Sequence, residues 1–134
     1  MSDLICRQEN TTGRITLNRP DALNALTHDM CLEMEAQLRI WADDPVITQI
    51  LVDASGDKAF SAGGDIQHLY DNGKKGDYAF GQKFWADEYR LNLLIASYPE
   101  PYVVFMQGFV MGGGVGVSCH GTYLELKITM RALD

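Results

Sequence analysis

Two glycine-rich segments carry the residue types best suited to chemistry in this chain. The first runs from Lys58 to Ile66 with the sequence KAFSAGGDI, and the second from Met111 to Gly116 with the sequence MGGGVG. Each follows a predicted strand and precedes a predicted helix, so each should present backbone N–H groups that lack helical partners. Two such loops can direct two donors at one carbonyl oxygen, which stabilises the negative charge that a thioester oxygen acquires during reaction. Glycine is expected to be required in both loops, because an acyl group must lie against the backbone.

Other interpretations of these segments are weaker. Each segment alone could be only a turn. A dinucleotide or nucleotide site does not fit, because GGGVG is not GxGxxG with an acidic residue ~20 positions later, and no GxxxxGK[ST] occurs. The three histidines are not spaced as metal ligands, and the three cysteines predict neither a disulfide framework nor a metal site. We therefore expect no metal site.

A third candidate is the carboxylate of Glu88, on a helix expected over residues 77–97. At helical spacing it falls in line with three apolar residues, Phe84, Leu91 and Ile95. Burial in such a stripe would raise the pKa of Glu88. The alternative is a partly exposed Glu88 at the edge of the stripe, paired with Arg90 or Lys83.

The elements expected around these residues alternate between strands and helices, which indicates an α/β fold. Residues 4–8 and 14–17 predict a β-hairpin, and residues 46–52 and 102–107 predict buried strands. Thr27 is the expected N-cap of a helix that ends near residue 43 and buries an apolar face formed by Met30, Met34, Leu38 and Trp41. Asp65 is expected to cap the next helix. A solvated acidic face is expected for this first helix and its end, formed by Glu33, Glu35, Asp43 and Asp44.

Charge and composition exclude several classes of partner. The net charge is −7, and the 11 Lys and Arg residues are scattered, which argues against binding nucleic acid. No apolar run approaches the ~18 residues of a membrane span, so no membrane partner is expected. The N-terminal sequence lacks the pattern of an export or transit segment, and the cysteine usage suits a reducing compartment. We expect a cytoplasmic protein.

Three motifs in order resemble the signatures of the crotonase (enoyl-CoA hydratase/isomerase) superfamily. They are NRPDALNAL at 18–26, AFSAGGDI at 59–66 and GFVMGGG at 108–114. The resemblance implies a spiral of ββα turns in which each turn packs on the next. It also implies that the backbone N–H groups of Gly64 and Gly113 form an oxyanion hole. Coenzyme A would be part of the acyl-CoA substrate, with no separate cofactor, and the positions implied to contact it are Ala22, Leu23, Ala62 and Ile66.

Within the superfamily, residues 87–92 (DEYRLN) and 112–121 (GGGVGVSCHG) resemble the 3-hydroxyisobutyryl-CoA hydrolase subgroup of valine breakdown. In that subgroup the residue that matches Glu88 contacts the substrate. Gly116 stands where hydratases of the superfamily carry a catalytic Glu, which counts against hydratase chemistry. An enoyl-CoA hydratase or isomerase is kept as an alternative function.

Hydrolases of this subgroup place an acid/base Glu, in a Pro-Glu pair, and a catalytic Asp downstream of the second glycine loop. Residues 122–134 contain no Pro-Glu pair. The expected fold is therefore a truncated crotonase-like ββα spiral, with residues 1–121 as its N-terminal part and residues 122–134 as an atypical tail. Without general acid–base catalysis, a factor of ~10²–10⁴ would be missing, so weak or absent turnover is expected.

A second alternative is a non-catalytic fragment that binds acyl-CoA or serves as an interaction surface. Apolar surface left uncovered by later turns would favour a homo-oligomer.

Overall fold

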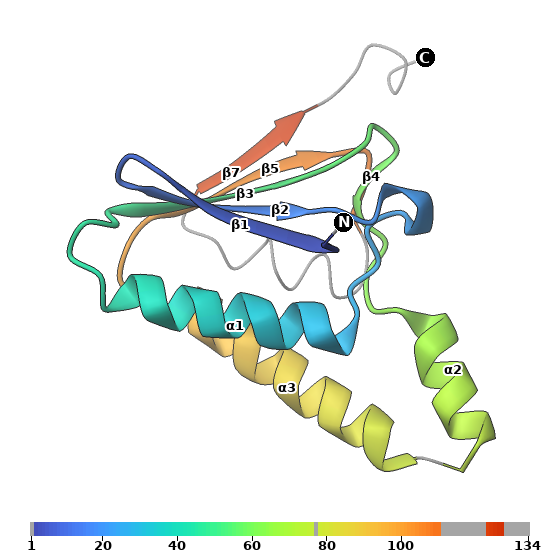
Figure 1. The fold of residues 1–134 in the computed structure, drawn as a ribbon. Coiled ribbons are helices and arrows are strands. Elements are labelled where there is room, and N and C mark those ends of the chain that lie inside the picture. Colours follow the sequence, from blue (N-terminus) through green and yellow to red (C-terminus); the bar gives the residue numbers. More distant parts are fainter. Residues whose placement is uncertain (1, 77, 111–122, 128–134) are drawn as a thin grey trace.

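The computed structural model describes residues 2–76, 78–110 and 123–127. Figure 1 shows a twisted sheet with two long helices beneath it. The strands are β1 (Leu4–Glu9), β2 (Thr12–Leu17), β3 (Gln49–Ala54), β4 (Ala59–Ser61), β5 (Tyr102–Gln107), β6 (Phe109–Val110) and β7 (Tyr123–Lys127). The helices are a 3₁₀ turn (Pro20–Ala22), α1 (His28–Ala42), α2 (Ile66–Lys74) and α3 (Tyr78–Ala96).

The main sheet has the strand order β1-β2-β3-β5-β7. Only β1 and β2 run antiparallel, as a hairpin, and each later pair of neighbours is parallel. Two short strands, β4 and β6, pair separately at one end of this sheet. Parallel neighbours need crossover connections, which α1 and α3 provide. This mixed α/β arrangement confirms the expected fold class.

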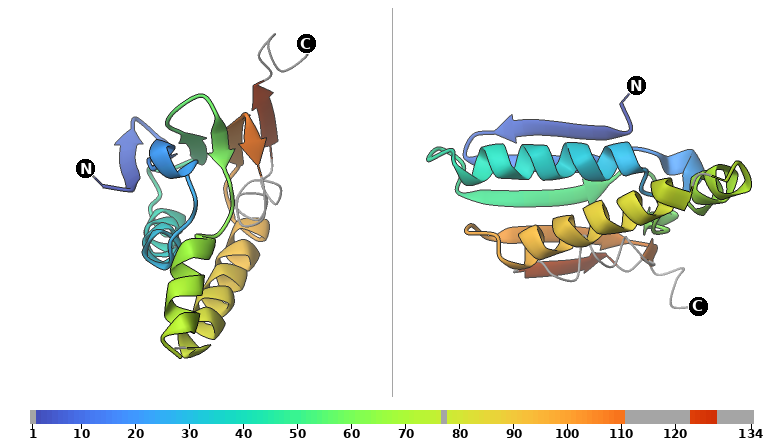
Figure 2. Two further views of the ribbon diagram at one scale, coloured as in Figure 1. Left: turned by 90° about the vertical axis from the view of Figure 1, so that its right-hand side faces the viewer. Right: turned by 90° about the horizontal axis from the view of Figure 1, so that it is seen from below.

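The core lies between the sheet and the helices α1 and α3. Figure 2 shows the two helices side by side across one face of the sheet, with α2 beyond its end. Alternate residues of the strands point toward the helices and are fully buried: Ile15, Leu17, Ile50, Val52, Tyr102 and Val104. The predicted apolar face of α1 is confirmed, because all four of its residues are buried. Every second residue of the strands therefore packs against the apolar face of α1 in one layer.

The ends of the elements show where local sequence patterns suffice. The Thr27 hydroxyl accepts a hydrogen bond from the Met30 N–H at 3.1 Å, which confirms the predicted N-cap of α1. The hairpin and β5 also lie where they were predicted. The strand expected at residues 46–52 instead runs from Gln49 to Ala54, because a turn formed by Asp44 holds Val46 and Ile47 before the strand. Residues 123–127 form β7 in a segment where no clear strand was expected.

The interface between α1 and α3 corrects one prediction. Glu35 was expected on a solvated acidic face, but only 8% of its surface is exposed. Its carboxylate binds Arg90 of α3 at 2.8 Å and Arg39 of α1 at 2.8 Å. The prediction was wrong because the α1 pattern does not show that α3 brings an arginine beside Glu35.

Within the described parts of the chain, no helix combines the length and the hydropathy that crossing a membrane would require.

Candidate functional site

The NRPDALNAL segment and the first glycine loop are joined by the side chain of Asn24. This side chain is buried, with 1% of its surface exposed. Its amide donates to the carbonyl oxygens of Ser55 and Ala59 at 2.8 and 2.9 Å, and its oxygen accepts the Arg19 N–H at 2.8 Å. One amide therefore connects Arg19, Ser55 and Ala59, which are up to 40 residues apart. All of its hydrogen-bonding atoms have partners, as buried polar groups require.

The backbone around Asn24 turns sharply to make these contacts. Leu23 and Asn24 both adopt left-handed conformations, with φ of 53° and 54°. The turn directs the Leu23 carbonyl at the N–H of Ala62, at 2.9 Å, and the Asn24 carbonyl at the hydroxyl of Ser61, at 2.9 Å. The segment that the resemblance assigns to coenzyme A thus lies directly against the glycine loop.

Gly64 has a backbone N–H that is available to a ligand. Leu26 forms a parallel β-bridge with Gly64, in which the Leu26 N–H donates to Gly63 at 2.7 Å and the Asp65 N–H donates to Leu26 at 2.9 Å. In a parallel bridge these bonds use the groups on either side of the central residue, so the Gly64 N–H points away from Leu26. Among the residues that the structure describes, no hydrogen bond uses this N–H. Within the described residues it is therefore a fixed donor without a hydrogen-bond partner.

The two glycines of this loop differ in what they require. Gly63 has φ of +98°, which disfavours any residue with a side chain. A Cβ added to Gly64 would lie 3.6 Å from Cζ of Phe84, an ordinary van der Waals contact. The fold therefore needs glycine at Gly63 and leaves room for a Cβ at Gly64, while the expectation that an acyl group needs glycine in this loop stays a prediction.

Arg19 holds the end of the loop next to α2. Its guanidinium donates to the Ala25 carbonyl at 2.7 Å and pairs with the Asp65 carboxylate at 3.1 Å. Both charged side chains are about four-fifths buried. Helix α2 begins directly after Asp65, at Ile66, as predicted, and the carboxylate of Asp65 also connects the loop to the NRPDALNAL segment.

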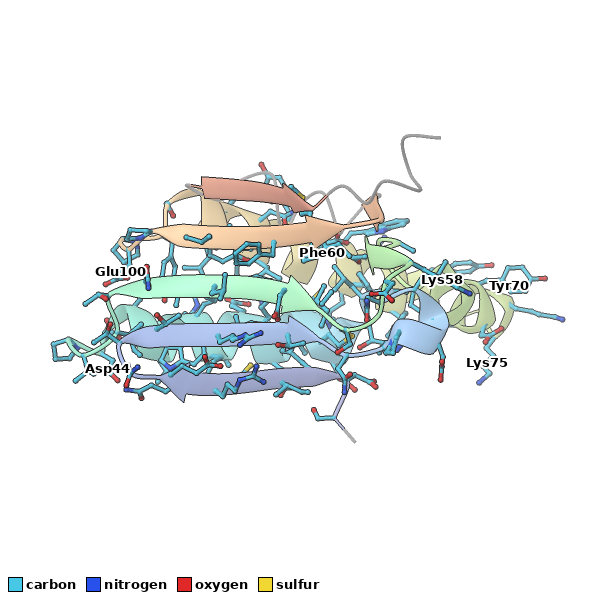
Figure 3. The ribbon with its side chains drawn as sticks, turned by 90° about the horizontal axis from the view of Figure 1, so that it is seen from above. Asp44, Lys58, Phe60, Tyr70, Lys75 and Glu100 are labelled. Atoms are coloured by element: carbon cyan, nitrogen blue, oxygen red, sulfur yellow. The ribbon has the colours of Figure 1, made fainter. Side chains whose placement is uncertain are left out.

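A hollow of about 390 Å³ opens beside this junction. Its walls are Pro20, Asp21, Leu23 and Asn24 on one side and residues 55–59 on the other. Lys58 is the basic residue of this lining, and Figure 3 shows it at the same end of the sheet as Tyr70 and Lys75. Of the residues expected to contact coenzyme A, Leu23 lines this hollow, whereas Ala22 lines a separate one with Asp3 and Asn18. Ala62 is half-buried in the adjoining loop.

Glu88 lies half-buried on α3, and burial raises its pKa, as predicted. Its three expected apolar neighbours, Phe84, Leu91 and Ile95, are all buried. The alternative pairing is wrong, because Arg90 and Lys83 bind the adjacent Asp87 at 2.8 and 3.5 Å. Within the described part of the chain, Glu88 has no ion-pair partner.

Asp87 and His28 form a buried polar contact that the sequence patterns did not reveal. Asp87 is 4% exposed, and its Oδ2 lies 2.5 Å from His28 Nε2. The His28 ring stacks on Phe84 with a centroid distance of 5.8 Å and an interplanar angle of 28°. The position of Asp87 three residues after Phe84, on the buried side of the helix, was the available clue.

The second glycine loop, with Gly113, lies outside the described residues, as does the side chain of Ile66. Among the residues that are described, no group of three or more His, Cys, Asp or Glu side chains could hold a metal ion.

Comparisons with known proteins show the family of this chain. A family model described as enoyl-CoA hydratase/isomerase matches residues 12–125. A mitochondrial 3-hydroxyisobutyryl-CoA hydrolase of Gallus gallus is 40% identical over 122 residues, which are 91% of this chain and 31% of the relative. The corresponding hydrolase of Xenopus tropicalis is 48% identical over 111 residues, 83% of this chain and 29% of the relative.

Solved structures show the same relationship. An enoyl-CoA hydratase from Rhodobacter sphaeroides superposes with a TM-score of 0.91 and 52% identity, over 93% of this chain and 37% of that one. A carnitinyl-CoA dehydratase from Mycobacterium thermoresistibile gives a TM-score of 0.90 and 43% identity, over 94% of this chain and 37% of that one. The chain spans about 30% of the length of these curated relatives. It belongs to the enoyl-CoA hydratase/isomerase family, the crotonase superfamily.

Proposed function

We propose that this chain binds an acyl-CoA thioester and polarises its carbonyl group, as part of an enzyme of the 3-hydroxyisobutyryl-CoA hydrolase type. The observation that carries the proposal is the N–H of Gly64, which the bridge to Leu26 fixes in direction and which no group in the described parts of the chain accepts. A fixed donor costs no reorganisation when negative charge develops on the thioester oxygen. The second donor is assigned to Gly113 from the family resemblance.

Glu88 is proposed to contact the acyl group. It lies one helical turn after Phe84, whose ring packs beside Gly64. Because burial raises its pKa, the carboxyl group keeps its proton to a higher pH than an exposed Glu would. A carboxyl group in either protonation state can accept a hydrogen bond from the hydroxyl of a 3-hydroxyacyl group.

The coenzyme A portion is proposed to lie along Leu23 and Ala62, over the hollow that Lys58 lines. Leu23 supplies apolar surface, and Lys58 supplies a cation for a phosphate group of the nucleotide. Such local attraction is needed because the net charge of the chain is −7. Ala22 and Ile66 keep their proposed roles from the resemblance alone.

For the 134-residue chain we propose binding with slow or absent thioester cleavage. Residues 122–134 contain no Pro-Glu pair, so these 134 residues do not include the acid/base group that the resemblance implies. Positioning and polarisation without general acid–base catalysis leave a factor of ~10²–10⁴ unrealised. An enoyl-CoA hydratase function is the second candidate, favoured by the 52% identity to the Rhodobacter sphaeroides structure and opposed by Gly116.

The test measures release of free thiol from 3-hydroxyisobutyryl-CoA, hydration of crotonyl-CoA, and binding of both by calorimetry, on the purified chain. We expect saturable binding of the hydroxyacyl-CoA with little thiol release. Thiol release at enzymatic rates would show that the chain holds its own acid/base group, and crotonyl-CoA hydration would favour the second candidate. Absence of binding would overturn the proposal.

We also propose that the chain self-associates through the outer side of α3. Four large side chains there are each more than half exposed, namely Tyr78, Trp85, Tyr89 and Leu93. Their spacing places them on one side of the helix, away from the buried face of Phe84 and Leu91. A contiguous exposed stripe of large aromatic and aliphatic side chains is a candidate protein interface.

A further inference from the structure

We infer that His28, held by Asp87, is a positioning residue that sets the direction of the Gly64 donor. This inference rests on the proposed function, because it concerns the same donor. Two sets of contacts support it. One connects Gly64 to His28 through the backbone before α1, and the other connects Gly64 to the His28 ring through Phe84.

The first side is the peptide backbone before α1. Leu26 holds both peptide units that flank Gly64 through bonds of 2.7 and 2.9 Å. Thr27 follows as the N-cap, and His28 is the first residue of α1. Only one residue therefore separates the His28 backbone from the strand-like contact that orients Gly64. A shift of the start of α1 would move Leu26, and with it the Gly64 N–H.

The second side is the ring of Phe84 on α3. An added Cβ on Gly64 would lie 3.6 and 3.7 Å from two atoms of this ring, so Phe84 lies against the side of Gly64 from which a Cβ would project. The His28 ring stacks on Phe84, and it also meets Phe80 edge-on at 5.8 Å. His28 thereby connects the two segments that contact Gly64, which are the backbone at Leu26 and the ring of Phe84.

Asp87 fixes the imidazole in this place. Its side chain is 5% exposed, and its Oδ2 lies 2.5 Å from His28 Nε2. Because a carboxylate accepts, the Nε2 atom carries the hydrogen. Arg90 and Lys83 hold the same carboxylate at 2.8 and 3.5 Å, and the hydrogen bonds lower the pKa of Asp87, that from His28 most strongly. The imidazole therefore has one orientation, set by a carboxylate that is itself anchored.

The consequence for the site follows from the geometry that an oxyanion donor requires. A donor polarises a carbonyl only if it stays within about 0.5 Å of its productive position. Without the imidazole, Phe84 loses a stacking partner and a space opens between α1 and α3. The Gly64 loop would keep its own hydrogen bonds but lose one of its two supports. His28 and Asp87 are thus expected to affect carbonyl polarisation more than nucleotide binding.

The experiment measures the polarisation of the bound thioester carbonyl from its stretching frequency. The probe is isobutyryl-CoA with a ¹³C-labelled thioester carbonyl, and infrared difference spectra give the shift of its stretch on binding. Wild type is compared with His28→Ala, His28→Gln and Asp87→Asn, and with Asp29→Ala as a matched control on the exposed side of the same helical turn. Circular dichroism confirms that each variant is folded, and calorimetry gives the dissociation constant.

His28→Ala is expected to lose about half of the carbonyl shift, while the dissociation constant changes less than about threefold. His28→Gln, which can still donate to Asp87, should recover part of the shift, and Asp29→Ala should match wild type. If His28→Ala does not fold, Asp87→Asn retains the volume of the side chain and is expected to show a smaller loss. Full shifts in the folded His28 and Asp87 variants would overturn this inference alone. Absence of a shift in wild type would overturn the proposed function together with it.

Discussion

Two regions of this molecule join distant segments by different physical means. The junction around Asn24 uses buried hydrogen bonds to backbone groups, and neither the amide nor the peptide groups change charge with pH. The interface between α1 and α3 uses ion pairs, in which the Glu35 carboxylate meets Arg39 and Arg90. The first region holds the NRPDALNAL segment against the residues that lead into the glycine loop, and the second sets the distance between two helices. The comparison shows that the hydrogen bonds of Asn24 do not depend on pH, whereas the ion pairs between α1 and α3 do.

The largest expected effect is at the neutral junction. Asn24→Ala removes three hydrogen bonds and leaves the Ser55 and Ala59 carbonyls without this partner, so we expect a loss of about 3 kcal/mol in the free energy of unfolding. Urea denaturation measures it. Asn18→Ala is the matched control, because the Asn18 amide donates to a single exposed carbonyl, and it should cost less than about 1 kcal/mol. Equal losses in the two variants would show that the junction has no special role.

A pair of alanine substitutions sharpens the same point within the loop. Gly63→Ala should destabilise the protein by about 2 kcal/mol, because its φ of +98° is unfavourable for a side chain. Gly64→Ala should change stability by less than about 0.5 kcal/mol and should retain acyl-CoA binding, since the new Cβ meets Phe84 at an ordinary distance. Thermal unfolding and calorimetry give both quantities. The expectation fails if Gly64→Ala is the more damaging change.

The ion pairs between α1 and α3 should make the free energy of unfolding depend on pH. Hydrogen bonds from Arg90, and then from Arg39, lower the pKa of Glu35 below its ordinary value of 4.5. The folded protein thus keeps this carboxylate ionised at a pH where the unfolded chain binds a proton. Its stabilisation is fully present above the unfolded pKa and is lost as the pH falls below it toward the folded pKa.

Urea midpoints measured between about pH 6 and pH 3 test this dependence. Glu35→Gln should show a smaller decrease in stability with acid than wild type, whereas Glu33→Gln, at an exposed position of the same helix, should follow wild type. The lowered pKa of Asp87 is expected to leave some acid dependence in the Glu35 variant. An unchanged slope in Glu35→Gln would place the acid sensitivity elsewhere.

The smallest effect on stability is expected on the outer side of α3. Trp85→Ser should weaken self-association about tenfold while leaving the unfolding midpoint nearly unchanged, because 62% of the Trp85 surface is exposed. Sedimentation equilibrium measures the association. Ile40→Ser removes another exposed apolar side chain, on α1, and is the matched control. A monomeric wild-type chain, or an equal effect of both substitutions, would contradict the proposed surface.

The sequence alone determined the hairpin, the N-cap and buried face of α1, the apolar stripe of α3, the first glycine loop and the family. These features depend on local spacing, with a period of two in strands and 3.6 in helices, and on motifs that are contiguous in the chain. The assignment of Gly113 stays a prediction from the resemblance.

Only the tertiary structure decided which groups meet. It turned the Gly64 N–H away from Leu26, which lies 38 residues earlier, and it placed Arg90 and Lys83 against Asp87 instead of Glu88. It also buried Glu35 and brought His28 onto Phe84. The physical reason is that periodicity shows which side of a helix is buried, whereas the partner on that side comes from another segment whose approach no local pattern contains.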